Sequence, residues 1–258
     1  VFPKDIIENR VLIKKRIEEA IDLAKKKGVK VVGLGGLLGS VTEGGAGLVK
    51  RDGVIVTAGR AYTAYVVTQY VEHAIRRFGL EKEKTTVAVV GAAGGVGSTV
   101  TKILAKDKFK KIILIDLERK LERIKKQTEE ISQHQTEIAI AHQMNRVLEA
   151  DIIITATNAP EAVLKSEDTK TGAIIIDDAQ PSDISPEVVE FRTDVVIIEA
   201  GVITAENIKT GTNFRLANKN EIYCCLGEIM SIAAADWNGE YSAGDISLST
   251  INEIASLA

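Results

Sequence analysis

The sequence predicts an α/β protein with a doubly wound parallel (Rossmann) sheet and a second, smaller lobe built from the N- and C-terminal segments. Two observations carry this prediction. Short continuous runs of Val and Ile alternate with helical segments through the middle of the chain, which is typical of a parallel sheet covered on both faces. A glycine-rich turn, Gly91–Gly97, directly follows one of these runs and opens a helix.

The composition limits the classes of function. The 258 residues are 45% hydrophobic, enough for a sizeable core in one large domain or two small ones. A net charge of −3 and only 4% aromatic residues argue against nucleic-acid binding. No apolar run approaches the length of a membrane span, and the start, Val-Phe-Pro-Lys, is not a signal peptide. Because it lacks an initiator methionine, we expect a processed chain or a piece of a longer one.

Hydrophobic periodicity places the elements in order. Helices are predicted at 5–27, 62–78, 98–105, 118–132, 221–236 and 249–257. Strands are predicted at 30–34, 54–56, 87–90, 112–115, 138–141, 152–154, 173–176 and 195–198. We therefore assign 1–81 to the N-terminal part of a substrate lobe with a bridging helix, 82–202 to the dinucleotide-binding domain, and 203–258 to the helical C-terminal part of the substrate lobe. Substrate is expected between the lobes, near the carboxyl ends of the parallel strands.

The glycine-rich turn is the strongest motif. Glycines let the backbone approach a pyrophosphate, and the N-terminus of the following helix offers N–H groups and positive potential. The alternative is a tight strand-to-helix turn with no ligand. The predicted phosphate-binding residues are Gly91, Ala93, Gly94, Gly95, Val96 and Gly97.

Asp116 ends the next predicted strand, 25 residues after Gly91. A carboxylate here can accept hydrogen bonds from the adenosine ribose hydroxyls and would repel a 2′-phosphate, which favours NAD(H) over NADP(H). Arg119 and Lys120 are close enough to leave NADP(H) open, and Asp116 could instead cap the following helix. Thr155, Ala156 and Thr157 are expected beside the nicotinamide ribose or in an ordinary loop, and Gly201 completes the predicted cofactor set.

Cys225 is the candidate nucleophile. In the first turns of a helix, the dipole favours a thiolate, which can attack an activated carbonyl and hold it covalently. The alternative is a buried structural cysteine, because a helix starting near Asn220 would place Cys225 on one stripe with Ile229 and Ile232. The adjacent pair, Cys224 and Cys225, predicts a reducing, cytoplasmic compartment. None of His73, His134 and His142 has metal-ligand spacing, so no metal is expected.

Five stretches, taken in order, carry a family resemblance. They are Leu34-Gly35-Gly36, Thr57 to Val66, Thr86 to Gly91 with its glycine loop, Ile176-Asp177 with Pro181, and Glu221 to Met230. They are similar to segments of the cyanobacterial long-chain acyl-[acyl-carrier-protein] reductases, which reduce fatty acyl thioesters to aldehydes. The resemblance implies that Cys225 accepts the acyl group. This chain has Asp178 and Ala179 where that family has two glycines, and Asp116 where that family, which uses NADPH, has a basic residue.

The leading hypothesis is a nicotinamide-dependent reductase that converts an acyl thioester to an aldehyde through a Cys225 thioester. The first alternative is an NAD-dependent dehydrogenase of a small amino or hydroxy acid with a structural cysteine; its shikimate dehydrogenase version lacks a matching lysine–aspartate pair. The second is a non-catalytic dinucleotide-binding regulator. Acyl chain length, an acyl carrier protein partner and a homo-oligomer are left open.

Overall fold

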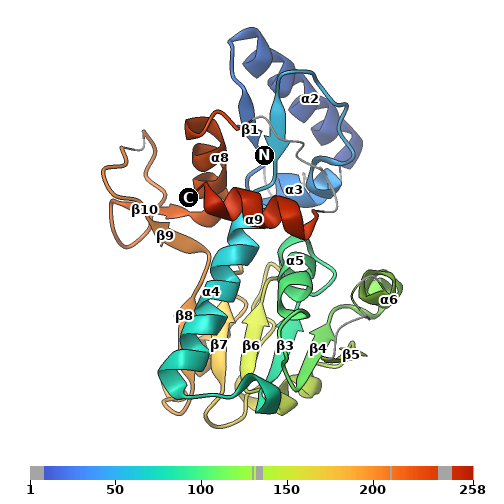
Figure 1. Ribbon diagram of the computed structural model, residues 1–258, viewed down its shortest axis with the longest axis vertical. Helices are drawn as coiled ribbons and strands as arrows, with labels where there is room; N and C mark the ends of the chain where they lie inside the picture. Colours follow the sequence, from blue (N-terminus) through green and yellow to red (C-terminus); the bar gives the residue numbers. More distant parts are fainter. Residues whose placement is uncertain (1–8, 130, 132–135, 210, 238–245, 258) are drawn as a thin grey trace. The chain divides into compact units, whose positions relative to one another are not determined.

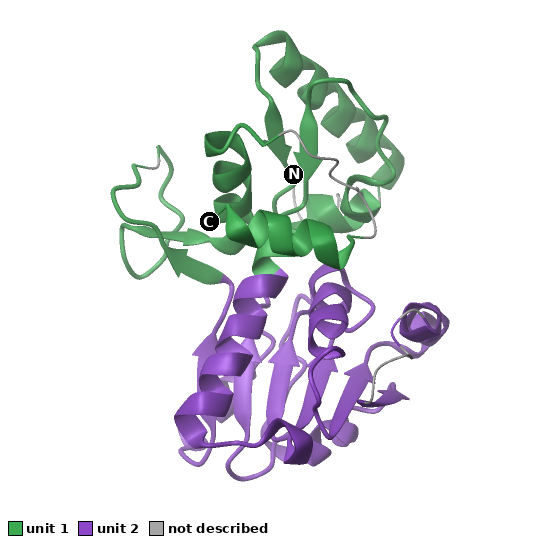
Figure 2. Cartoon of the chain, in the orientation of Figure 1, with its two compact units in different colours: residues 1–63, 202–258 green, residues 64–201 purple. Residues whose placement is uncertain are grey.

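The computed structural model describes residues 9–129, 131, 136–209, 211–237 and 246–257. Contacts divide the chain into two compact units (Figure 2). Unit 1 combines residues 1–63 with 202–258, and unit 2 comprises residues 64–201. The two boundaries predicted from the sequence were 81/82 and 202/203, whereas the units divide at 63/64, inside helix α4, and at 201/202.

Unit 2 is built on six parallel strands in the order β5-β4-β3-β6-β7-β8 (Figure 1). The strands are β3 (Thr86–Val90), β4 (Lys111–Ile115), β5 (Glu137–Ala141), β6 (Ile152–Thr155), β7 (Ile174–Asp177) and β8 (Val196–Glu199). From β3 the chain adds β4 and β5 toward one edge of the sheet, and then β6, β7 and β8 toward the other edge, so the order of the strands reverses between β3 and β6. Ligands of such folds bind outside the carboxyl ends of the strands at this switch point.

The central apolar runs become strands β3, β4, β6 and β7 because both faces of the sheet are buried there. Every residue of β3 is buried, and successive side chains belong to different core clusters. Val87 and Val89 pack in the cluster that includes residues of α4 and α5, whereas Ala88 and Val90 pack with Val188 and the opposite layer. The covering helices are α4 (Arg60–Phe78), α5 (Gly95–Leu104), α6 (Leu121–Glu129) and α7 (Pro186–Phe191), with short 3-10 turns at Lys82–Lys84, Glu118–Lys120, Met144–Glu149 and Ser166–Asp168. The predicted fold class is confirmed.

Unit 1 contains two small sheets. Strands β1 (Val31–Gly33) and β2 (Ile55–Thr57) pair in parallel, and β9 (Val202–Thr204) pairs antiparallel with β10 (Glu221–Tyr223). Its helices are α2 (Arg10–Lys26), α3 (Leu37–Val41), the 3-10 turn Glu43–Gly45, α8 (Cys224–Ala234) and α9 (Leu248–Ser256). Helix α8 packs on β1 so closely that a Cβ on Gly33 would lie 1.9 Å from Cδ1 of Ile229.

Two predicted helices differ from the structure in ways that matter for the site. The helix predicted at 98–105 begins at Gly95, so the last glycines of the loop lie inside its first turn. The helix predicted at 221–236 begins at Cys224, because residues 221–223 extend to pair with β9. Residues 5–8, 130 and 132, at the ends of the predicted helices 5–27 and 118–132, lie outside the described residues.

Candidate functional site

The glycine loop presents unpaired backbone donors at the switch point of the sheet. Gly94 is the N-cap of α5 and its own N–H donates to the Gly91 carbonyl at 2.8 Å. In the described part of the chain, the N–H groups of Gly95, Val96 and Gly97 donate to no acceptor. Three free amides in the first turn of a helix are suited to binding an anion such as a pyrophosphate.

At Gly91 and Gly97 the loop has no space for a side chain. A Cβ on Gly97 would lie 2.4 Å from the Gly91 carbonyl oxygen, and one on Gly91, whose φ is +85°, would lie 2.6 Å from the Ala156 carbonyl oxygen. The Ala156 N–H also donates to Val90 at 3.0 Å. The predicted residues of the glycine loop and of the segment after β6 are therefore neighbours. This cradle of bare backbone fits a dinucleotide pyrophosphate.

Asp116 directly follows β4, and its carboxylate is occupied by donors of its own unit. The Ala93 N–H donates to Oδ2 at 2.9 Å, and the Leu117 N–H donates to Oδ1 at 2.8 Å. The Lys120 ammonium lies 3.0 Å from Oδ1. Asp116 thus holds the glycine loop, a role the sequence did not suggest. The alternative that it caps the next helix is wrong, because Leu117 is the N-cap of the turn Glu118–Lys120.

A network of hydroxyls and carboxylates follows the ends of β6 and β7. The Thr155 hydroxyl donates to Oδ1 of Asp177 at 2.7 Å, and the Ser182 hydroxyl donates to Oδ2 at 2.6 Å. Thr157 donates its N–H to Asp183 at 2.9 Å and its hydroxyl to the other oxygen of the same carboxylate. Asp177 and Asp183 thereby fix the backbone after β6 that was predicted to lie beside the nicotinamide ribose.

Asp178 lies at the same edge, next to Gly201. A Cβ on Gly201 would be 3.3 Å from Oδ1 of Asp178, so the carboxyl packs against the bare backbone of this glycine. Burial, together with the negative charges of Asp177 and Asp183, raises the pKa of Asp178 to about 8. The predicted cofactor residues after β3, β6 and β8 all lie at the carboxyl ends of the parallel strands.

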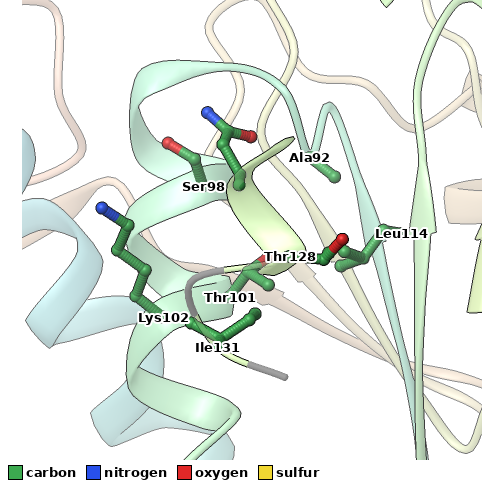
Figure 3. Close-up of a pocket in the computed structure, with 8 residues that line it drawn as sticks. Ala92, Ser98, Thr101, Lys102, Leu114, Thr128 and Ile131 are labelled. Atoms are coloured by element: carbon green, nitrogen blue, oxygen red, sulfur yellow. The ribbon is translucent and has the colours of Figure 1, made fainter. Parts of the chain in front are cut away.

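A small cavity between α5 and α6 is not this site (Figure 3). Its volume of about 10 Å³ can hold one water molecule, whereas cofactor pockets need hundreds of cubic ångströms. It is lined by Ala92, Ser98, Thr101, Lys102, Leu114, Gln127, Thr128 and Ile131.

In unit 1, the two cysteines have different environments. Cys224 is buried, with 1% of its surface exposed, whereas Cys225 is half-buried. The expectation that the helix buries Cys225 as a core residue is wrong, because the buried stripe of α8 contains Cys224, Glu228 and Ile232. Cys225 is the second residue of α8, where the helix dipole favours a negative charge.

A glycine and a buried carboxylate connect Cys225 to the segment before α4. A Cβ on Gly59 would lie 2.3 Å from Cβ of Cys225, so the Gly59 backbone touches the cysteine. Glu228, which is completely buried, accepts a hydrogen bond from the Thr57 hydroxyl and another, at 2.8 Å, from the Tyr62 N–H. Thr57 in turn accepts from the Gly59 N–H at 2.9 Å. Sequence reasoning missed this network, although its residues lie in the two stretches, Thr57 to Val66 and Glu221 to Met230, that carried the resemblance.

The described residues offer neither a metal site nor a helix able to cross a membrane. No group of three His, Cys, Asp or Glu among the described residues could hold a metal ion, and His134 lies outside them. No described helix has both the length and the apolar character needed to cross a membrane.

The sequence of unit 2 matches a known protein family. Residues 49–200 match the model of the shikimate / quinate 5-dehydrogenase family. The chain belongs to this family. The match covers most of unit 2, with its glycine loop and the carboxyl ends of β3, β6 and β7, and it identifies the chain as a member of the nicotinamide-dependent oxidoreductases.

Individual relatives are more distant. Aminotransferase PigE of Serratia sp. is 24% identical over 95% of this chain, which spans only 29% of that protein. Long-chain acyl-[acyl-carrier-protein] reductase of Synechococcus elongatus is 26% identical over 89% of this chain and 69% of its own length. The structure of shikimate 5-dehydrogenase from Listeria monocytogenes, in complex with shikimate and NAD, aligns with 71% of this chain and 72% of its own, at 15% identity and a TM-score of 0.41.

Proposed function

We propose that this chain is a nicotinamide-dependent reductase of an activated acyl group, with Cys225 as the nucleophile. The observation that carries the proposal is the placement of Cys225: it is the accessible cysteine of the pair, in the first turn of α8, against a glycine backbone. The 26% identical relative named as an acyl-[acyl-carrier-protein] reductase supports the same chemistry. Acyl length, the carrier and an acyl carrier protein partner belong to this proposal.

The first step uses residues of this chain. The Cys225 thiolate attacks the carbonyl carbon of an acyl thioester, a new C–S bond forms, and the carrier leaves as a thiolate that takes up a proton. Cys225 lies at the N-terminus of α8, and the N–H groups of the first turn of a helix point toward its N-terminus. They can therefore stabilise the negative charge of the thiolate and of the carbonyl oxygen during the attack. When bound, a reduced nicotinamide supplies the hydride that converts the enzyme thioester to an aldehyde and returns the thiolate.

The cofactor is assigned to the carboxyl end of the unit 2 sheet. The free amides of Gly95, Val96 and Gly97 would bind its pyrophosphate, and Thr155 to Thr157 would lie beside the nicotinamide ribose. NAD(H) is proposed as the preferred form, because Asp116 would meet a 2′-phosphate with a carboxylate. Lys120 on the same carboxylate keeps NADP(H) a competitor.

The test separates covalent chemistry from a structural cysteine. The chain is incubated with a radiolabelled acyl thioester and no cofactor, then digested and mapped. We expect the label on the Cys225 peptide of the parent, none on Cys225→Ser, and the parent level on Cys224→Ser if that variant folds. Iodoacetamide at pH 7 should also modify Cys225 faster than Cys224. Absence of acyl label together with selective labelling of Cys224 would exclude the proposal.

The second candidate is a dehydrogenase of a small amino or hydroxy acid, and the family match over 49–200 favours it. In that case the role of Cys225 is structural: its contact with Gly59 packs the segment after β2 against α8. The Cys225→Ser variant separates the two candidates, because a small-molecule dehydrogenase keeps its activity in this variant and a thioester-forming reductase loses it. Binding of substrate between the lobes stays a prediction under both.

A further inference from the structure

Asp178 differs from the other carboxylates at the carboxyl ends of the strands. It directly follows β7, and its own N–H donates to the Thr155 carbonyl at 2.9 Å. In the part of the chain that the structure describes, no hydroxyl, amide or cation donates a hydrogen bond to its carboxyl group. An acidic side chain without an internal donor leaves its hydrogen bond to a ligand or to water.

The neighbouring acids have no such freedom. Asp177 accepts from Thr155, Ser182 and the Ala179 N–H, and Asp183 accepts twice from Thr157. These hydrogen bonds hold both carboxyl groups in place. Glu199, which stands opposite Asp177 on β8, is exposed. The charges that act on the Asp178 carboxyl are those of Asp177 and Asp183, and both are negative.

These surroundings favour the protonated, neutral form of the Asp178 carboxyl. Burial is the larger cause and the charges of Asp177 and Asp183 add to it, so that the Asp178 carboxyl keeps its proton until about pH 8. At neutral pH the group is a hydrogen-bond donor, and a small change in nearby charge suffices to ionise it.

The proposed cofactor site brings such a change next to it. The free amides of the glycine loop fix the pyrophosphate after β3, and Asp178 follows β7, two strand spacings or about 10 Å away. Asp116, which marks the adenosine side, follows β4 on the opposite side of β3. The nicotinamide end therefore lies toward β6 and β7. Its ring is neutral when reduced and positively charged when oxidised.

We propose that Asp178 couples the redox state of the cofactor to a proton: the neutral acid accompanies the reduced ring, and the carboxylate pairs with the oxidised ring. Binding of the oxidised cofactor then releases the Asp178 proton to solvent, whereas binding of the reduced cofactor releases none. This inference rests on the proposed cofactor site but not on the role of Cys225.

The experiment measures binding, without turnover, by calorimetry from pH 6 to 9. In the parent, the affinity for NAD⁺ should rise about 10- to 100-fold across this range, because an opposite charge within about 5 Å lowers a carboxyl pKa by 1–2 units. The affinity for NADH should change less than about 3-fold, because its ring has no charge to interact with the carboxylate. Titration in two buffers of different ionisation enthalpy should detect up to one proton released per NAD⁺ near pH 7.

The variants decide the outcome. Asp178→Asn keeps the size of the side chain and should remove both the pH dependence and the proton release; Asp52→Asn, an exposed acid of unit 1, should retain them. Equal pH dependence in Asp178→Asn and the parent overturns the inference and leaves the cofactor site intact. A chain that binds neither form overturns the cofactor site as well, so the two failures are distinguishable.

Discussion

Gly59 and Cys225 are in backbone-to-side-chain contact: a Cβ on Gly59 would lie 2.3 Å from Cβ and 2.4 Å from Cα of Cys225. Gly59 also has a φ of +72°, which L side chains rarely adopt. Both constraints require glycine. The contact places the segment between β2 and α4 directly against the first turn of α8, so the position of Cys225 depends on that segment.

Gly59→Ala should therefore reduce reductase activity about 100-fold or more, because even a 1 Å displacement of a reacting group can cost that much. Gly53→Ala is the matched control. Gly53 has the same φ of +72° but nothing within 4 Å of a Cβ, so it incurs only the backbone strain. Steady-state kinetics and circular dichroism on both variants check this. Equal effects would show that strain, and not the contact with Cys225, is responsible.

Glu228→Ala should destabilise the protein by about 2–4 kcal/mol, since it leaves the Thr57 hydroxyl and the Tyr62 N–H without their acceptor inside the core. Glu206→Ala, at an exposed position of the same unit, should change stability by less than about 0.5 kcal/mol. Urea unfolding measures both free energies. Comparable values for the two variants would mean that the buried network does not hold α8.

The sequence predicted the central strands of the sheet well, but it misplaced the start of α8 for a physical reason. The runs that became β3, β4, β6 and β7 are continuously apolar because these strands are buried on both faces, a pattern that can be recognised without knowing the partner strands. The start at Cys224 depends on a distant partner: residues 221–223 extend because they pair with Val202–Thr204. Helical periodicity cannot detect this pairing. It also favoured the apolar stripe of Cys225 as the buried one, whereas the buried stripe contains the Glu228 carboxylate, which accepts hydrogen bonds from Thr57 and Tyr62.

In the candidate site, too, features set by local sequence could be predicted and features set by distant residues could not. Gly91 to Gly97 were predicted because their spacing directly after a strand is a local signal. Asp178 was missed as a candidate because a carboxyl in a loop after a strand looks like ordinary surface. Its raised pKa arises from burial and then from the charges of Asp177 and Asp183, and its position arises from packing against Gly201. Two consecutive aspartates at a strand end were the only local signal.

Substitutions of Asp116 and of Lys120 should change the preference for NADH over NADPH in opposite directions. The parent is expected to bind NADH more tightly than NADPH. Lys120→Ala should widen this preference about 3- to 10-fold, because it removes the cation that offsets the Asp116 carboxylate. Asp116→Ser should narrow it. Lys125→Ala, which pairs with Glu122 on the exposed side of α6, should leave the ratio unchanged. Fluorescence titration with both cofactors gives the ratio, and tighter NADPH binding by the parent would contradict the expectation.

Stability against pH tests the ionisation of Asp178 independently of any ligand. Its pKa is raised from 3.8 to about 8 by burial and by the charges of Asp177 and Asp183. In the unfolded chain the group ionises near pH 4, while the folded protein keeps the proton. The stabilisation from this group is thus complete below pH 4 and is lost as the pH rises through about 8. The free energy of unfolding should fall over this window.

Asp178→Asn removes that loss. Relative to the parent, the variant should be about 2–4 kcal/mol more stable at pH 9 and nearly equal at pH 4, since each unit of pKa shift corresponds to about 1.4 kcal/mol and the partly exposed side chain reduces the full effect. Asp194→Asn provides the opposite sign in the same unit: its hydrogen bond with Arg192 lowers the pKa of Asp194, so this variant should lose stability equally at pH 6 and pH 9. Urea unfolding at the three pH values measures these differences. A stability gain for Asp178→Asn that is the same at pH 4 and pH 9 would mean that packing, and not ionisation, accounts for the effect.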